Sequence, residues 1–265
     1  MNRGEPIDQL LLTELLVKPG SLWRRVDVVA STGSTNADLA QKARHGAESG
    51  SVLVTGFQSA GRGRLGRSWV APAESSIALS LLVRPDQVAS WRWTWLPLLT
   101  GLAVVEGLRR AADVPAMLKW PNDVLVRERK LAGILAERVE TPSGPACVVG
   151  IGLNVSLAED ELPVPTATSL QLAGAATTNR NTLIATILRA FALIYQQWES
   201  SDDDAAFGAA YIARCATIGR QVKVVLAADS EVTGTAEAID GDGRLVVRTA
   251  AGRRTFGAAD IVHLR

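Results

Sequence analysis

The sequence predicts an α+β fold, in which helices flank a mixed β-sheet and a small β-barrel follows at the C-terminus. Helix-like and strand-like segments are mixed over residues 7–215 without strict alternation, which favours a mixed sheet. With 47% hydrophobic and 21% charged residues, the 265-residue chain can bury one sizeable core and a small second one. From about Gly219, short alternating strands are joined by tight turns. We therefore expect two domains, residues 1–217 and 218–265.

Charge and rare residue types exclude several classes of function. The 28 basic residues stand against 27 acidic ones, so no overall field attracts nucleic acid or a membrane surface, and any basic site must be local. Two cysteines and two histidines supply neither a disulfide framework nor a zinc site nor a Cys/His nucleophile pair. The chain has no secretory signal pattern and no long apolar run. A cytoplasmic protein with no membrane partner is expected.

The N-terminal part begins with a helix and a strand. Leucines at helical spacing predict a helix over 7–17, which Pro19-Gly20 ends. A β-branched run predicts a strand over 23–32. The segment 36–46 is typical of a short helix that stops at its glycine.

The central part is richer in strands. A mostly apolar helix is expected over 93–112, packed across the sheet. Turn residues at 121–123 and 141–145 separate the last predicted strands. Apolar, β-branched runs predict strands over 51–58, 75–83, 116–120, 131–140 and 146–155.

Two helices and a cluster of short strands complete the chain. A helix is predicted over 181–198, with Asn179 or Asn181 as its N-cap, and another over 202–215. About five strands then follow in fewer than fifty residues, joined by turns at 240–243 and 250–252.

Residues 61–67, GRGRLGR, hold three glycines and three arginines. They match the dinucleotide pattern G-x-G-x-x-G and nearly match the phosphate-loop pattern. Both patterns need a helix directly after the loop, whose N-terminus binds phosphate. Pro72 and the lack of apolar periodicity over 68–75 argue against that helix. The glycines of this loop allow unusual backbone angles, and its guanidinium groups suit phosphate or carboxylate oxygens. The alternative is that the arginines are simply solvated and bind no ligand.

Three further clusters each have a functional and a structural interpretation. In GSTN (33–36), Thr35 and Asp38 form a variant of the helix capping box, or the same groups bind small polar parts of a ligand. KWPND (119–123) is either a tight turn or a site with a cation, an amide and a carboxylate close together. RKLAGI (129–134) either sets a lysine beside a glycine that allows a ligand to approach the backbone closely, or simply carries a solvent-facing lysine at the start of a strand.

Together these clusters predict a site rich in Arg and Lys that lacks a Cys/His nucleophile. Such a site suits a reaction in which the substrate itself attacks and the protein stabilises negative charge. Nucleotidyl transfer fits, because a carboxylate then attacks the α-phosphate of ATP while cations stabilise the phosphorane and the departing pyrophosphate.

Five motifs, in this order and at this spacing, resemble biotin protein ligases: GSTN (33–36), QSAGRGRLGRSW (58–69), KWPNDVLV (119–126), RKLAGIL (129–135) and GIGLNV (150–155). The resemblance runs from about Trp23 to Arg265. It implies a core related to that of class II aminoacyl-tRNA synthetases and an SH3-like C-terminal barrel. It also implies biotin and ATP with Mg²⁺ as substrates, no covalently bound cofactor, and a two-step reaction through biotinyl-5′-adenylate that releases pyrophosphate and then AMP.

The resemblance also implies three groups of site residues. The amide and hydroxyl groups are expected to meet the ureido group of biotin, and the arginine-rich loop is expected to close over biotin and phosphates as a lid. The biotin-binding group is Ser34, Thr35, Asn36, Gln58, Arg62, Gly63, Arg64, Trp69, Lys130, Gly133 and Gly152. The ATP-binding group is Arg62, Arg64, Arg67, Asn122, Asp123, Lys130, Asn154 and Arg265, with Asp123 as the aid to magnesium. The catalytic group is Arg64, Lys119 and Lys130.

The implied partner is the biotin carboxyl carrier domain of an acyl-CoA carboxylase. Only about twenty residues precede the first predicted strand, too few for the helix-turn-helix domain of ligases that double as repressors, so no DNA binding is expected. One alternative is a lipoate or octanoate ligase or transferase of the same fold. A less favoured alternative is an RNA-binding module, because no aromatic residues interleave the arginines.

Overall fold

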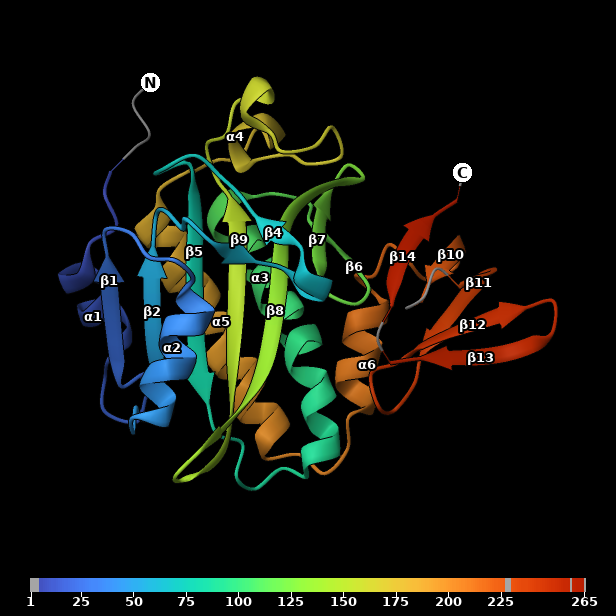
Figure 1. Ribbon diagram of the computed structural model, residues 1–265, viewed down its shortest axis with the longest axis horizontal. Helices are drawn as coiled ribbons and strands as arrows, with labels where there is room; N and C mark the ends of the chain where they lie inside the picture. The colour runs from blue at the N-terminus through green and yellow to red at the C-terminus, as the bar shows by residue number, and fades with distance from the viewer. Residues whose placement is uncertain (1–4, 227–229, 258, 265) are drawn as a thin grey trace.

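The computed structural model describes residues 5–226, 230–257 and 259–264, and Figure 1 shows a large layered body beside a smaller β-sheet. The large sheet has seven strands in the order β1-β2-β5-β9-β8-β7-β6. Strands β1 and β2 are parallel and the other neighbours are antiparallel, which confirms the predicted mixed sheet. Its strands are β1 (Arg25–Val29), β2 (Ser51–Thr55), β5 (Ser76–Val83), β6 (Met117–Lys119), β7 (Asp123–Val126), β8 (Arg129–Thr141) and β9 (Gly144–Asn154).

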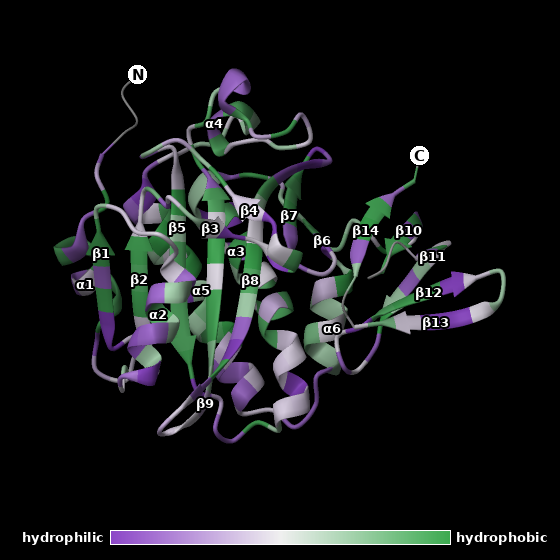
Figure 2. Ribbon diagram, viewed as in Figure 1, coloured by the Kyte–Doolittle hydropathy of each residue, from purple (hydrophilic) through white to green (hydrophobic). Residues whose placement is uncertain are grey.

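Helices cover both faces of this sheet. In Figure 1, α3 and α5 lie behind the sheet and α2 lies in front of it. Strands β2 and β5 are buried along their whole length because they are covered on both faces, and Figure 2 shows them as mostly apolar. The helices are α1 (Gln9–Leu16), α2 (Thr35–Arg44), α3 (Leu96–Ala112), α4 (Leu170–Ala173), α5 (Arg180–Glu199) and α6 (Ala205–Ile212). None of the helices in the described part of the chain is long and apolar enough to cross a membrane.

Some boundaries differ from those predicted. The helix expected over 93–112 starts as a 3-10 turn, η2 (Ser90–Trp95), and becomes α-helical at Leu96, with a proline in its first turn. Asn179 is the N-cap of α5, since its side chain accepts from the backbone N–H of Thr182. Strand β7 and helix α4 were not predicted, because four residues are too short to show a periodicity.

The smaller sheet has five antiparallel strands in the order β13-β12-β11-β10-β14. Val222, Val224 and Leu245 are fully buried, but they belong to the same contiguous hydrophobic core as Trp95 and Trp120 of the large body, so the predicted second core is not separate. The strands are β10 (Gln221–Val225), β11 (Glu231–Ile239), β12 (Leu245–Thr249), β13 (Gly252–Phe256) and β14 (Asp260–His263). The described residues show no ladder from β13 to β14, so the sheet is open there.

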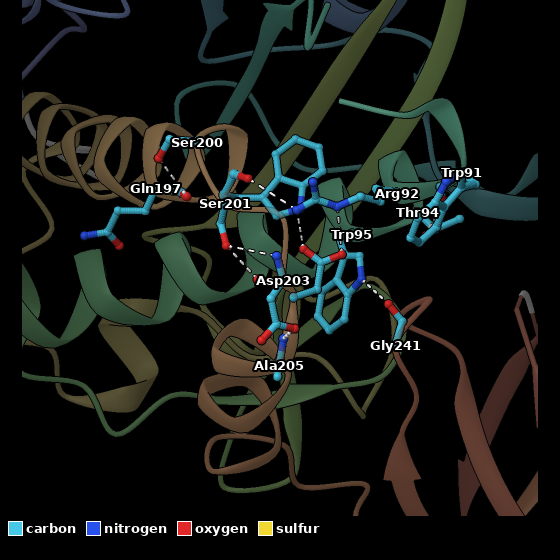
Figure 3. Close-up of polar contacts among 12 residues, drawn as sticks. Trp91, Arg92, Thr94, Trp95, Gln197, Ser200, Ser201, Asp203, Ala205 and Gly241 are labelled. Atoms are coloured by element: carbon cyan, nitrogen blue, oxygen red, sulfur yellow. Dashed lines mark hydrogen bonds and ion pairs between the residues drawn. The ribbon is translucent and has the colours of Figure 1, made fainter. Parts of the chain in front are cut away.

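Three backbone carbonyls of the turn between β11 and β12 attach this sheet to the large body. We call residues 241–243 the carbonyl hook. Trp95 Nε1 donates to Gly241 O at 2.9 Å, as Figure 3 shows, and Trp120 Nε1 donates to Gly243 O at 3.0 Å. Thr94 Oγ1 donates to Asp242 O at 2.8 Å. The hook holds the smaller sheet against the turn before α3 and the residue that follows β6.

Candidate active site

A cleft of about 490 Å³ opens between the large sheet, the smaller sheet and the arginine-rich loop. Most of the residues implied by the five motifs line it, although they come from segments more than a hundred residues apart. The predicted residues that line it are Ser34, Thr35, Asn36, Gln58, Arg62, Gly63, Arg64, Arg67, Trp69, Lys119, Asn122, Asp123, Lys130, Gly133 and Gly152. The ligand roles assigned to them stay predictions.

Asn154 is a predicted site residue that the structure does not bring to the cleft. Its side chain is buried and its amide group donates to Thr168 O at 2.9 Å. It therefore holds the chain that follows β9. Arg265 lies outside the described residues.

An amide and hydroxyl wall forms one end of the cleft, at the N-terminus of α2. The N-cap is Ser34 and not Thr35, because Ser34 Oγ accepts from the backbone N–H of Ala37. The predicted capping box is therefore wrong, and Thr35 is left for another contact. The backbone N–H and the hydroxyl of Thr35 both donate to Gln58 Oε1, at 2.8 and 3.1 Å. We call Thr35, Asn36 and Gln58 the amide wall.

Glycines form the floor of the cleft and the indole of Trp69 lies directly on it. Gly133 and Gly152 are register partners in β8 and β9. A Cβ atom added at Gly152 would lie 2.4 Å from Trp69 Cε2, and one at Gly133 would lie 3.2 Å from Trp69 Cζ3. Only glycine lets the aromatic ring approach the sheet this closely. Trp69 Nε1 is buried without a hydrogen-bond partner among the described residues, so a donor is available at this point.

The arginine-rich loop is a hairpin over the cleft. Strand β3 (Gly61–Arg62) pairs with β4 (Ser68–Trp69) across a 3-10 turn, η1 (Arg64–Gly66). Gly66 has a φ of 74°, and Leu65 at the exposed tip has a φ of 54°. No helix follows the loop, which confirms that neither nucleotide-binding pattern applies.

Two arginines of the hairpin reach across the cleft. Arg64 Nη1 donates to Asn122 Oδ1 at 3.1 Å, and it lies 3.5 Å from Ala259 O in the smaller sheet. Arg67 forms an ion pair with Asp260 of β14. Burial lowers the pKa of Arg64, and the charge of Arg67 lowers it further against the opposing pull of Asp123. A guanidinium group still keeps its proton at neutral pH.

Cations gather at the opposite end from the amide wall. Lys130 Nζ lies 2.6 Å from Asp123 Oδ1 and 5.9 Å from the centre of the Trp69 ring. Lys119 lies beside them at the end of β6, which pairs with β7 through Lys119 and Asp123. Several positive groups therefore surround the single carboxylate of Asp123. The cluster keeps a net positive charge and suits an anionic ligand.

The described residues contain no group of three or more His, Cys, Asp or Glu side chains that could hold a metal on their own. A single carboxylate does fit Mg²⁺ that arrives with ATP, because this ion commonly takes one or two carboxylates and completes its shell with phosphate oxygens and water. Asp123 is the residue of the cation cluster that can serve in this way.

Several residues of the site were missed. Gly150 lines the floor and Asp260 lines the side facing the smaller sheet. Glu137 and Ser80 contact the amide wall from behind. Gly150 stands two residues before Gly152 in a strand, and this spacing could have placed it on the same face. Asp260 gives no local signal, since its position depends on how the two sheets meet.

Known proteins resemble this chain along its length. A model of the biotin/lipoate A/B protein ligase family matches residues 28–154, and a model of the biotin protein ligase C terminal domain matches residues 217–264. The chain is 44% identical over 264 residues to the biotin–[acetyl-CoA-carboxylase] ligase of Mycobacterium tuberculosis, which covers 98% of this chain and 97% of that protein. It is 32% identical over 252 residues to the bifunctional ligase/repressor BirA of Escherichia coli, which covers 92% of this chain and 74% of that protein.

A solved structure agrees with these matches. The biotin protein ligase from Aquifex aeolicus in complex with biotin and ATP superposes with a TM-score of 0.77 at 26% sequence identity, over 92% of this chain and 100% of the other. The predicted fold and the resemblance are therefore confirmed, and this chain belongs to the biotin protein ligase family.

Proposed function

We propose that this chain uses ATP to attach biotin to one lysine of the biotin carboxyl carrier domain of an acyl-CoA carboxylase. One observation carries the proposal: a single cleft joins the amide wall to the cation cluster across a glycine floor. The wall offers hydrogen-bonding groups for a ureido ring, the indole of Trp69 offers an apolar surface to a ligand body in the cleft, and the cations suit a carboxylate and phosphates. The names of the relatives support the same substrates.

In the first step, an oxygen of the biotin carboxylate attacks the α-phosphorus of ATP. A new P–O bond forms, the bond to the β-phosphate oxygen breaks, and pyrophosphate leaves. Lys130 and Arg64 stabilise the negative charge that builds on the α-phosphate oxygens, because both are fixed in the cleft before the reaction. Asp123 would hold Mg²⁺ on the phosphates, where the ion neutralises charge on the leaving pyrophosphate.

In the second step, the ε-amine of the acceptor lysine attacks the carbonyl carbon of the mixed anhydride. The C–N bond forms, the C–O bond to AMP breaks, and the amine nitrogen loses a proton. The hairpin that carries Arg62, Arg64 and Arg67 lies over this centre and keeps water from the adenylate. Lys119, at the side of the cleft lined by β14, orients a phosphate oxygen or the incoming lysine.

Exchange of labelled pyrophosphate into ATP tests the first step. We expect exchange that depends on biotin in the wild type, and a loss of about 10²- to 10³-fold in kcat for Lys130→Ala and for Arg64→Ala, since each removes charge from the developing phosphorane. Lys18 is exposed, follows α1 and does not line the cleft, so Lys18→Ala is the matched control and should keep wild-type activity.

Other results would contradict parts of the proposal. Full activity in both variants would contradict the site assignment. Exchange that depends on lipoate or octanoate and not on biotin would favour the related ligases of the same fold. Binding of RNA that weakens steeply with salt and ignores biotin would favour a nucleic-acid module. A cytoplasmic location and the absence of DNA binding stay predictions.

A further inference from the structure

A hydrogen-bond network behind the amide wall ends on a carboxylate that does not line the cleft. Glu137 lies on β8, two residues beyond Leu135 and four beyond Gly133, so its side chain is on the same face of the strand as the cleft floor. Its Oε2 accepts from Asn36 Nδ2 at 2.7 Å and lies 3.2 Å from Arg62 Nη2. Glu137 therefore contacts both the amide wall and the hairpin.

The amide group of Asn36 has one orientation in this network. Its two N–H groups donate to Leu135 O at 3.1 Å and to Glu137 Oε2 at 2.7 Å, and its Oδ1 accepts from Ser80 Oγ at 2.6 Å. An ionised carboxylate accepts hydrogen bonds and cannot donate one. Because Glu137 and Leu135 O both need a donor, the amide group cannot turn over while these two contacts are kept.

The free hydrogen-bonding capacity of Asn36 is therefore an acceptor, and it points to the floor of the cleft. A Cβ atom added at Gly150, which lines the cleft, would lie 2.3 Å from Asn36 Oδ1. The amide group of Gln58 offers a donor instead. Its Oε1 already accepts two hydrogen bonds from Thr35, and its Nε2 has no acceptor among the described residues. The wall thus presents an acceptor at Asn36 and a donor at Gln58, which matches a group with N–H beside C=O.

We propose that Glu137 is a positioning residue that fixes the carbonyl oxygen of Asn36 toward the cleft and so selects ligands that place an N–H donor there. The proposal rests on biotin being the substrate. Without the carboxylate, Ser80 Oγ can accept from Asn36 Nδ2 while it donates to Thr35 Oγ1, which lies 2.8 Å away. A reversed amide would then lose only its hydrogen bond to Leu135 O, and it would set its N–H against the N–H of the ligand.

The contact of Arg62 with the same oxygen connects the wall to the hairpin. Both side chains of this ion pair are partly exposed, so it is a weak contact on its own. The orientation of Asn36 is accordingly the main effect, and the closing of the hairpin is the lesser one.

The test compares three variants by the KM values for biotin and for ATP in pyrophosphate exchange. For Glu137→Ala, we expect the KM for biotin to rise about 10- to 100-fold, the usual effect of mispairing a buried polar group, with the KM for ATP unchanged. Glu137→Gln retains an acceptor for Asn36 and should stay within about threefold of the wild type. Glu137→Met fills the same space without an acceptor and should behave as Glu137→Ala does. It provides the same test if the alanine variant fails to fold.

Biotin analogues provide a second readout, which a purely structural role would not change. The two ureido N-methylbiotins each lack one N–H donor. The wild type should discriminate strongly against the analogue whose missing N–H faces Asn36, and Glu137→Met should lose most of this discrimination. An unchanged KM for biotin in Glu137→Met, or an equal rise in both KM values, would overturn this inference. A wild type without biotin-dependent exchange would instead overturn the proposed function.

Discussion

Lys119 is a cleft residue whose environment disfavours its charge. Burial lowers the pKa of its amine below the ordinary value for lysine, and the neighbouring cations Lys130 and Arg67 lower it further, against the opposing effect of Asp123. The amine therefore loses its proton at a lower pH than an exposed lysine does.

The activity should accordingly decline at alkaline pH. Because the charged form of Lys119 is the one that stabilises phosphate, kcat/KM for exchange should fall as the pH rises through the lowered pKa, at a pH below that at which an ordinary lysine loses its proton. In Lys119→Arg the fall should move to higher pH, since a guanidinium group keeps its proton. Profiles of kcat/KM against pH for both proteins, with Lys18→Arg as the control, would show this. If kcat/KM fell over the same alkaline pH range in the wild type and in Lys119→Arg, the assignment of this fall to Lys119 would be contradicted.

At the scale of residues, the sequence predicts the parts of the site that lie within short motifs. Lys119, Asn122 and Asp123 are neighbours in one turn, so their proximity follows from the chain itself. Glu137 and Asp260 could not be found in this way. Each reaches the site through sheet register or through the meeting of two sheets, which a local pattern does not contain.

At the scale of elements, a buried ion pair joins η2 to the start of α6. Arg92 donates to both carboxylate oxygens of Asp204, at 3.0 and 2.6 Å, and its guanidinium lies 5.3 Å from the centre of the Trp198 ring. Figure 3 shows Arg92 in this position, close to Trp95. Both charged side chains are less than a tenth exposed. A buried arginine without its partner would carry an uncompensated charge.

Asp204→Asn should therefore destabilise the protein strongly. We expect the free energy of unfolding to fall by about 3–5 kcal/mol, the usual effect of removing one partner of a buried pair. Urea unfolding followed by tryptophan fluorescence measures it. Asp202→Asn, two residues earlier and exposed, is the matched control and should change the stability by less than about 0.5 kcal/mol. A small effect of Asp204→Asn would show that Arg92 reaches water or another acceptor.

The long elements could be predicted, and among the short ones the three-residue strand β6 was found within the predicted strand 116–120 while others were missed. Helices α3 and α5 and strands β5, β8 and β9 span enough residues for their periodicity to be recognised. Strands β3, β4 and β7 have two to four residues, and they exist because a partner strand lies beside them. Their place in the site is set by tertiary contacts.

At the scale of the whole molecule, the cleft is shared between two sheets. The floor belongs to β8 and β9, while Asp260, Ile261 and Val262 of β14 form the facing side. We propose a boundary between two domains at residues 217 and 218, which the separate sheets support. The sequence predicted a separate small core in the C-terminal part, but not that its last strand would complete the cleft.

The carbonyl hook provides a test of this arrangement. Insertion of one glycine between Asp242 and Gly243 should displace the carbonyls from their three donors and lower the free energy of unfolding by about 3 kcal/mol, at roughly 1 kcal/mol for each hydrogen bond. Biotin-dependent exchange should fall with it, because β14 would leave the cleft. Gly241→Ala has open space around its Cβ position and is the control, with near wild-type stability and exchange. Equal behaviour of the two variants would contradict a role for the hook.

Every amino acid has a backbone carbonyl, so the hook attaches the smaller sheet without depending on which side chains the turn carries. Trp95, Thr94 and Trp120 on the other side must keep their donors, and the turn must keep its length. Gly241 and Asp242 can thus be replaced more readily than Gly243, whose φ of 76° favours glycine, while a single insertion or deletion is penalised. Grafts that give this ligase a different C-terminal sheet should be designed by matching the spacing of this turn and by keeping a glycine at position 243.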